Sequence, residues 1–278
     1  MELPEVESFR RLLAKCACGQ RVDDVIVVDP GVLRNTGAAA LRRIMRGRII
    51  GEPARHGKWL MTPIDGPCLV FHFGMTGELV WVADGHRHPH DRLIVRFGQG
   101  ELCYRDQRKL KGIWLARDAD EVCRIVGSLG PDALAVTAAQ LRRLLEGRRA
   151  GLRAAMTDQA VIAGLGILLA DEILWQARLH PRRVAASLDA TEHARLYAAM
   201  RHVLRVSVRD GHVPPRPDWL TGARILKTPL CPRCGGLLVR ERVGGRSSYH
   251  CPRCQPAPAP GSADKVARST GTGPSTIR

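Results

Sequence analysis

The chain has 278 residues, enough for one large domain or two modest ones, and its 43 Lys and Arg against 27 Asp and Glu give a formal net charge of +16. It has no apolar run of the roughly 18 residues that a transmembrane helix needs, and its opening MELPEVES lacks the basic and apolar segments of a signal peptide. We therefore expect a cytoplasmic protein without membrane contact. The charge is carried mostly by Arg and spread along the chain, which favours a polyanion partner, although a generally basic protein has the same composition.

The first half of the chain combines a leading helix with many short strands. Residues 3–20 predict an amphipathic helix, because Val6, Phe9 and Leu13 recur on one face. A β-branched run at 22–28 and a helical pattern at 38–46 follow. Between residues 47 and 115 short apolar runs alternate with Gly, Pro and charged turns, which predicts a β-sandwich or barrel. These runs are 59–61, 69–73, 79–82, 92–97 and 112–115.

The second half is helical and ends in a cysteine-rich module. Residues 128–131 (SLGP) indicate a linker, and helical patterns cover 138–147, 168–177 and 191–209. After Gln255 the composition is Pro, Ala, Gly, Ser and Thr, which predicts a disordered tail. We expect an α+β protein with four segments: a β-sandwich domain with its leading helix (1–127), a helical domain (132–222), a cysteine module (223–255) and the tail (256–278).

Two cysteine pairs predict a zinc site. Cys231-x-x-Cys234 and Cys251-x-x-Cys254 are separated by sixteen residues, and two such turns supply four thiolates for a closed, tetrahedral, structural Zn²⁺. A chance or redox pair is the alternative, which the repeated Cys-Pro-Arg-Cys pattern disfavours. Between the pairs a basic hairpin would present Arg246 either to a phosphate or simply to solvent. The five other cysteines are expected to be reduced thiols.

A series of short motifs, taken in order, resembles one protein family. The motifs are Glu2-Leu-Pro-Glu-Val-Glu7, Lys58 in HGKWL, the run from His72 to Leu79, Asp106-x-Arg108, Leu129-Gly-Pro131, Gly164-x-Gly166 with Glu172, His180-Pro181 and the four-cysteine finger with Arg246. Over about residues 1–255 the series resembles the formamidopyrimidine-DNA glycosylase and endonuclease VIII family. The resemblance implies an N-terminal helix with a β-sandwich, a helix-two-turn-helix domain and a C-terminal zinc-finger hairpin. It also implies a nucleoid-associated monomer that acts on damaged or abasic double-stranded DNA.

The resemblance further implies roles for single residues in base-excision repair. Family members flip a damaged nucleotide out of the duplex, attack the sugar C1′ with an N-terminal amine, and cleave the strand from the resulting Schiff base. Carried over, the catalytic residues are Met1 as the amine, Glu2 as general acid and base, and Lys58 near the lesion. The DNA-binding residues are His72, Met75, Arg108, Leu110 and Arg246, of which Met75, Arg108 and Leu110 would fill the gap left by the flipped nucleotide. An α-amino group suits this chemistry, because its ordinary pKa of about 7.7–8.0 leaves a useful neutral fraction.

The sequence departs from the family pattern in several places. Family members usually begin Met-Pro-Glu-Leu-Pro-Glu, and removal of Met exposes a proline amine. Here Met1 takes that position with a primary amine, because an initiator Met is normally kept before a residue as large as Glu2. Ile167 stands where the family has a phosphate-binding Asn, and Leu110-Lys111 replaces a Phe-Gly pair. The segment 205–231 is also shorter than in members with a long base-recognition loop.

Two functions therefore stay open on the sequence. One is a DNA glycosylase and abasic-site lyase; the other is a non-catalytic, zinc-dependent binder of damaged DNA on the same scaffold. A misassigned translation start is a third, mundane explanation for the missing proline. The singled-out residues also have plain interpretations: Glu2 favouring the dipole of the first helix, Met75 in the core and Lys58 as a surface charge.

Overall fold

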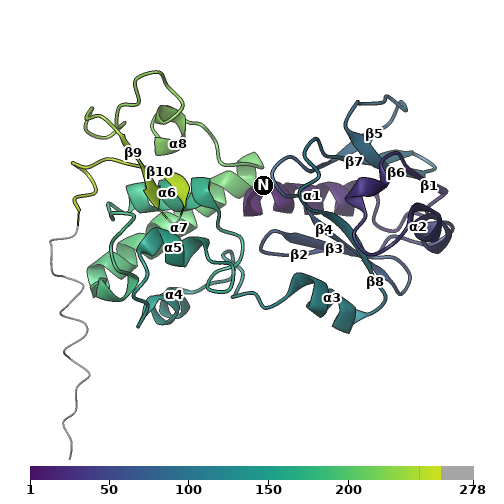
Figure 1. Cartoon of the computed structure of the whole chain (residues 1–278), viewed down its shortest axis with the longest axis horizontal. Helices are drawn as coiled ribbons and strands as arrows, with labels where there is room; N and C mark the ends of the chain where they lie inside the picture. Colours follow the sequence, from purple (N-terminus) through teal and green to yellow (C-terminus); the bar gives the residue numbers. More distant parts are fainter. Residues whose placement is uncertain (244, 258–278) are drawn as a thin grey trace, which may run out of the picture. The chain divides into compact units, whose positions relative to one another are not determined.

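The computed structural model describes residues 1–243 and 245–257, so residues 258–278 of the predicted tail lie outside the described part of the chain. That part divides into two compact units (Figure 1). The first comprises Met1–Asp132 with Val208–His212, and the second comprises Ala133–Ser207 with the chain from Val213 onward. The predicted α+β class is confirmed, whereas the four segment boundaries stay predictions. None of the described helices is both long and apolar enough to cross a membrane.

The first unit begins with α1 (Leu3–Cys16). Pro4 in its first turn has a backbone angle suited to starting a helix, and the Glu5 carboxylate accepts a hydrogen bond from the Glu2 N–H at 3.0 Å. The apolar face is buried, with Val6 and Leu13 at most 1% exposed. The helix ends four residues before the predicted position 20, and Gly19 follows in a turn with φ of 78°.

Two four-stranded antiparallel sheets follow, as the alternating apolar runs predicted. In the order of pairing, the first sheet consists of β1 (Asp24–Val27), β6 (Asp91–Phe97), β7 (Gly100–Arg105) and β5 (Glu78–Val82). The second consists of β2 (Ala54–His56), β3 (Trp59–Pro63), β4 (Cys68–His72) and β8 (Gly112–Ala116). The remaining elements are η1 (Pro30–Val32), α2 (Ala38–Met45) and α3 (Ala119–Val126).

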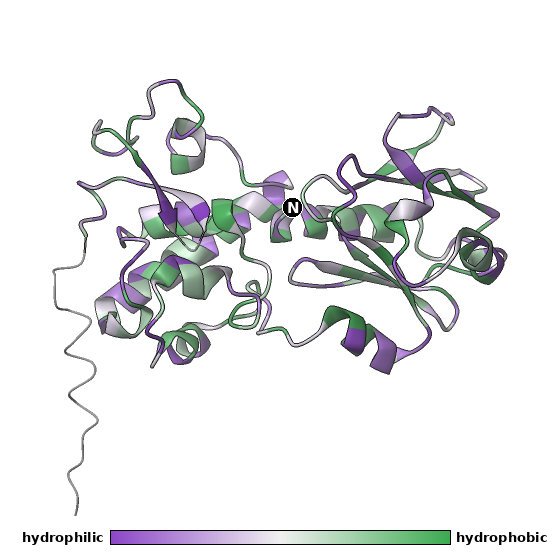
Figure 2. Cartoon of the chain, in the orientation of Figure 1, coloured by the Kyte–Doolittle hydropathy of each residue, from purple (hydrophilic) through white to green (hydrophobic). Residues whose placement is uncertain are grey.

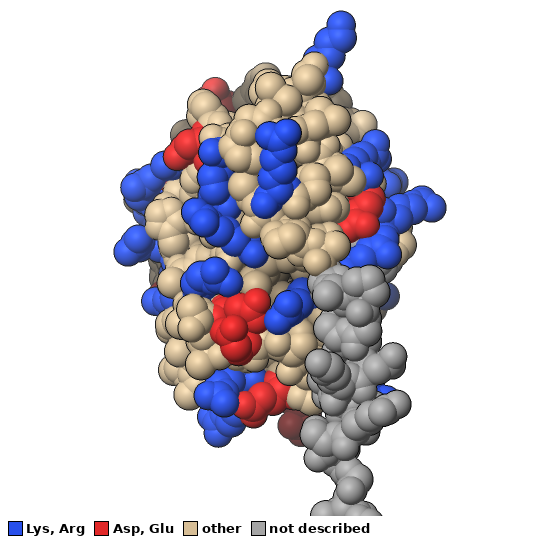
Figure 3. All heavy atoms as spheres, turned by 90° about the vertical axis from the view of Figure 1, so that its left-hand side faces the viewer, with Lys and Arg blue, Asp and Glu red and all other residues tan. Residues whose placement is uncertain are grey.

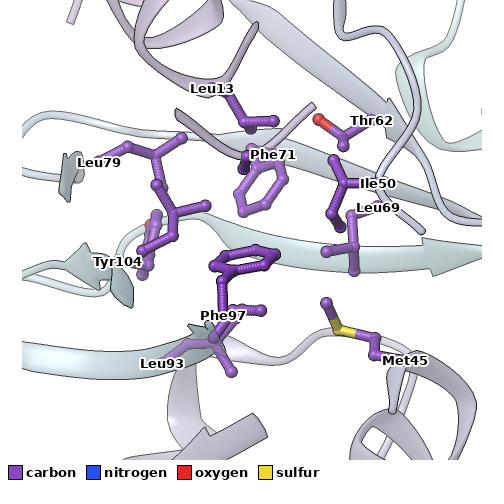
Figure 4. A pocket seen from close by; sticks show the side chains of 13 residues that line it. Leu13, Met45, Ile50, Thr62, Leu69, Phe71, Leu79, Leu93, Phe97 and Tyr104 are labelled. Carbon is purple, nitrogen blue, oxygen red and sulfur yellow. The ribbon is translucent and has the colours of Figure 1, made fainter. Parts of the chain in front are cut away.

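The two sheets, α1 and α2 share one apolar core, which makes the unit a sandwich. Figure 2 shows the hydrophobic stretches along α1 and the strands. A small enclosed gap in this core is lined by side chains from α1, α2 and both sheets, among them Leu13, Met45, Phe71 and Phe97 (Figure 4). Its lining is apolar apart from Thr62 and Tyr104. We therefore interpret the gap as a packing defect of the core.

The second unit is helical and carries the cysteine hairpin. Its elements are α4 (Ala138–Leu145), α5 (Leu152–Thr157), α6 (Ile167–Gln176), η2 (Ala185–Ser187), α7 (Ala190–Asp210), α8 (Leu220–Ala223), β9 (Val239–Val243) and β10 (Arg246–His250). The residues 208–210 at the end of α7 belong to the first unit. The predicted helices at 138–147, 168–177 and 191–209 are confirmed to within two residues at their ends.

A buried ion pair attaches the hairpin to α6. The carboxylate of Asp171 is fully buried and accepts from Arg153 Nε at 2.8 Å, and Arg224 Nη1 lies 3.4 Å from its other oxygen. It also accepts from Ser248 Oγ at 2.8 Å and from the Tyr249 N–H at 3.2 Å, both on β10. The position of β10 therefore depends on one carboxylate in the middle of a buried helix.

Candidate functional site

The strand registers bring three basic groups to one end of the second sheet. Trp59 pairs with His72, and His72 pairs with Gly112. Because pairing is antiparallel, Lys58 just before β3 and Lys111 just before β8 both lie beside the end of β4. The sequence predicted that Lys58 and His72 belong to the site, whereas Lys111 was noted only because it stands where the family has a glycine. The signal that identifies Lys111 is this pairing register, which a single sequence does not contain.

Two loops at this end are tied together by one buried carboxylate. Glu78 pairs with Arg105, so the loop before β5 and the loop after β7 leave the first sheet side by side. Asp106, only 1% exposed, accepts from Thr76 Oγ1 at 2.6 Å and from the N–H groups of Arg108 and Lys109 at 3.1 Å each. The two loops thus form one hydrogen-bonded unit.

A glycine fixes the path of the first loop. The N–H of Gly77 donates to the carbonyl oxygen of Phe73 at 2.8 Å. A Cβ on Gly77 would lie 2.6 Å from that same oxygen and 2.9 Å from the Tyr104 hydroxyl. Any larger residue would therefore displace the loop that carries Met75.

The N-terminal amine lies in this loop region. The Met1 amine donates to the carbonyl oxygen of Gly74 at 2.8 Å, and the partly buried Met1 side chain packs on the sandwich core. Glu2, at the start of α1, is only 8% exposed. A partly buried amine is therefore followed in the chain by a residue whose acidic side chain is nearly buried. Glu2 also starts α1, so its plain interpretation as a residue that favours the helix N-terminus fits the same geometry.

The site carries positive charge around a neutral histidine. Burial, together with the nearby charges of Lys111, Lys58 and the N-terminal amine, lowers the pKa of His72 to about 4. Its Nδ1 accepts from the Gly74 N–H at 3.1 Å, and its ring meets Trp59 edge-on at 4.7 Å. His72 is therefore uncharged at neutral pH and links the strand end to the loop. The three surrounding cations make this edge attractive to an anion.

Two large apolar side chains project from the paired loops. Met75 is 59% exposed and Leu110 is 52% exposed, so the interpretation of Met75 as a core residue is wrong. Arg108 Nη1 lies 3.0 Å from the Met75 sulfur, which joins the two loop tips. Large apolar side chains that are exposed together on neighbouring loops are a feature of binding surfaces.

The four cysteines of the second unit come together as predicted. Their sulfur atoms all lie within 4.8 Å of one another, with Cys231–Cys254 at 3.9 Å and Cys234–Cys251 at 3.5 Å. Trp175 Nε1 donates to Cys231 Sγ at 3.4 Å. Four thiolates converging on one point suit tetrahedral Zn²⁺ with no open position. Arg246, the first residue of β10, is exposed on the hairpin that this cluster anchors.

Glu172 and the Gly164-x-Gly166 turn contribute to the scaffold. Gly164 takes φ of 109° and donates its N–H to Gln159 Oε1 at 3.0 Å before α6 begins. Glu172 is fully buried and accepts from Gln176 Nε2 at 3.0 Å and from the Thr221 N–H at 2.9 Å. Burial raises its pKa to about 7. These contacts connect α6 to α8 within the second unit.

These parts define a class of protein: a sandwich whose edge carries the N-terminal amine, and a helical unit that ends in a four-cysteine hairpin of the zinc-finger type. Family models match them in the same order. Residues 1–113 match the formamidopyrimidine-DNA glycosylase N-terminal domain, residues 129–214 its H2TH domain, and residues 230–257 the zinc finger found in FPG and IleRS. The chain belongs to the formamidopyrimidine-DNA glycosylase family. The finger match and the clustered sulfurs together assign a structural Zn²⁺ to the four cysteines.

Relatives and solved structures cover nearly the whole chain. The formamidopyrimidine-DNA glycosylase of Pelotomaculum thermopropionicum is 36% identical over 273 residues, which span 91% of this chain and 98% of the relative. That of Moorella thermoacetica is 38% identical over 259 residues, or 91% of each chain. The Lactococcus lactis Fpg in complex with DNA containing an abasic site is 27% identical, with a TM-score of 0.83 over 92% of this chain and 100% of that one. A MutM complex with DNA containing carbocyclic 8-oxo-G is 28% identical, with a TM-score of 0.82 over the same shares of the two chains.

Proposed function

We propose that this protein binds damaged duplex DNA, removes a damaged base and cleaves the strand at the abasic sugar, with the Met1 amine as nucleophile. The observation that carries the proposal is the partly buried amine 2.8 Å from the Gly74 carbonyl, next to the nearly buried Glu2. The relatives at 36–38% identity are named glycosylases, and the structural neighbour of Lactococcus lactis holds DNA with an abasic site.

The chemistry follows from an amine beside a carboxyl group. The neutral amine attacks C1′, and the bond between C1′ and the base breaks. The electron pair of that bond leaves with the base, which then takes up a proton. Opening of the sugar ring moves a proton to its ring oxygen and leaves an imine on Met1. Loss of a C2′ proton then expels the 3′ phosphate, and water releases the amine. Glu2 is the group that gives and takes these protons.

The surrounding residues supply binding and positioning. Lys58 and Lys111 attract the phosphates on either side of the flipped nucleotide, and Arg246 contacts phosphate from the finger hairpin. His72 stays neutral and holds the loop that supplies the Gly74 carbonyl. Met75, Arg108 and Leu110 fill the space that the flipped nucleotide leaves in the stack. Basic side chains are also spread over the face drawn in Figure 3, with acidic ones interspersed among them.

The test is covalent trapping. The zinc-loaded full chain, its N-terminal residue verified by intact mass, is incubated with a duplex containing one abasic site and sodium borohydride. We expect a reduced adduct that peptide mapping places on Met1. Glu2→Gln should slow adduct formation by about 10²-fold or more while leaving affinity for the duplex unchanged. Glu52→Gln, at a side chain that is 73% exposed, is the matched control and should change neither.

Each alternative has its own result. An adduct on Lys58 or Lys111 keeps the lyase but removes Met1 from the mechanism. Tight binding with no adduct leaves a DNA-binding protein without catalysis. Two observations favour this second function: Met1 carries a primary amine, and an apolar Ile167 begins α6 where an amide would bind phosphate. The two functions are thus separated by one experiment.

A further inference from the structure

We propose that the second unit holds a second divalent metal site, separate from the four cysteines, formed by His180, Glu241 and His250. His180 follows α6, Glu241 lies on β9, and His250 ends β10. One ligand atom from each lies within 4.8 Å of the other two. The three residues come from different segments, and the fold alone brings them together.

Two atoms of this cluster are buried without a hydrogen-bond partner in the described part of the chain. They are Glu241 Oε1 and His250 Nδ1. They face each other at 3.6 Å, which is too long for a hydrogen bond, and His250 is only 5% exposed. Unpaired buried polar atoms are rare because losing water without replacement is unfavourable. A metal ion between the two atoms would bind both.

The spacing and chemistry of the donors fit zinc. Zn²⁺ binds imidazole nitrogen and carboxylate oxygen at about 2.0–2.2 Å, so tetrahedral donors lie roughly 3.4 Å apart. The Glu241–His250 distance of 3.6 Å already approaches this value. The rings of His180 and His250 meet at 70° with their centroids 4.6 Å apart, so small side-chain rotations complete the convergence. Three protein ligands leave a fourth position for water.

Neighbouring groups orient the ligands, and metal binding would replace one existing hydrogen bond of His180. Arg182 Nη2 pairs with Glu241 Oε2 at 2.9 Å and leaves Oε1 turned toward the histidines. The Arg182 N–H donates to His180 Nδ1 at 3.1 Å. A metal-bound neutral imidazole carries its proton on the other nitrogen, so coordination by His180 displaces this bond. The loss of one hydrogen bond is small beside the binding free energy of a zinc site.

The site would join the helical part of the second unit to its hairpin. The cysteines close the base of the hairpin, whereas His180 belongs to the segment after α6. A metal bound by His180, Glu241 and His250 therefore restrains β9 and β10, and with them Arg246. This role does not depend on whether the protein is a catalyst.

Metal counting tests the proposal. The full chain is equilibrated with micromolar free zinc, freed of excess metal, and its zinc content is measured by mass spectrometry of the element. We expect two zinc ions per chain in the wild type and in Glu146→Gln, which neutralises an exposed carboxylate of the same unit that belongs to neither cluster. Glu241→Gln and His180→Gln should each hold one.

Cobalt spectra identify the site that is lost. Co²⁺ bound by thiolates gives a sulfur-to-metal charge-transfer band, whereas the second equivalent should add visible absorption without more of that band. Both ligand variants should keep the thiolate band, which shows that the finger is still folded. One zinc per chain in the wild type, or two in Glu241→Gln, would overturn the proposal.

Discussion

The buried Asp171 offers the sharpest test of how the hairpin is held. Asp171→Asn keeps the shape of the side chain but removes its charge. The oxygen of Asn still accepts from Arg153 and Ser248, whereas its NH₂ faces the Tyr249 N–H and Arg224, which now meet a donor. Arg153, only 2% exposed, is left buried without its carboxylate.

The expected loss is large for one substitution. Breaking one side of a buried ion pair costs about 3–5 kcal/mol, because the remaining charge stays out of water. For a unit of this size that corresponds to a fall in Tm of roughly 10–15 °C. Hydrogen exchange of the β10 amides should accelerate together with the loss of stability, since β10 is held through this carboxylate.

The assay is scanning calorimetry with hydrogen exchange of β10, and the control is Glu146→Gln. That change neutralises another acid paired with an arginine of the same unit, at 3.0 Å from Arg142, but there both side chains are more than half exposed. The control should lose at most about 1 kcal/mol. If Asp171→Asn loses no more than the control does, the buried pair does not hold the hairpin and the reasoning fails.

Other predictions follow from the same geometry. Burial raises the pKa of Glu172 from 4.5 to about 7. As pH rises from about 4.5 to 7 the carboxyl group ionises in the unfolded state but stays protonated in the folded one, so the free energy of unfolding should fall by roughly 3 kcal/mol. In urea unfolding, Glu172→Gln should remove the change in the free energy of unfolding between pH 4.5 and 7, and this variant should be more stable than the wild type at pH 8. An unchanged pH dependence would contradict this. Chelation of zinc, or Cys234→Ser, should abolish hydrogen-exchange protection of β9 and β10 while the sandwich keeps its own, and equal loss in both units would argue against a local role. Arg246→Ala should reduce the slope of log DNA affinity against log salt concentration by about one phosphate contact. An unchanged slope would mean that Arg246 contacts solvent and not phosphate. Met75→Ala with Leu110→Ala should weaken binding to abasic duplex about tenfold or more, with stability within about 0.5 kcal/mol because both side chains are exposed.

Periodicity predicted most of the longer elements, but it missed β7 (Gly100–Arg105) and α3 (Ala119–Val126) as well as several short ones. The amphipathic pattern located α1, α4, α6 and α7, because each buries one side or the whole of a helix of eight or more residues. Strand β2 (Ala54–His56) was missed, because three residues without an apolar run give no signal. Helix α5 was missed too, because its six residues are too few for periodicity to show.

The candidate site could be predicted only as far as its motifs reach. The cysteines were identified by their spacing, since a metal needs four ligands on two tight turns. The convergence of Met1, Lys58, His72 and Lys111 depends on strand register, and the carboxylates of Asp106 and Asp171 act across long separations. Such partners depend on how the elements pair and pack, and a single sequence does not reveal that.

The carboxylate of Asp106 bears on the thermodynamics of recognition. Because it binds Thr76, Arg108 and Lys109 at once, the conformational entropy of the two loop tips is lost when the protein folds and not when it meets a ligand. Met75 and Leu110 are thus preorganised. Association at this edge should show little entropic penalty from the protein, and discrimination between duplexes should rest on how readily the DNA itself deforms.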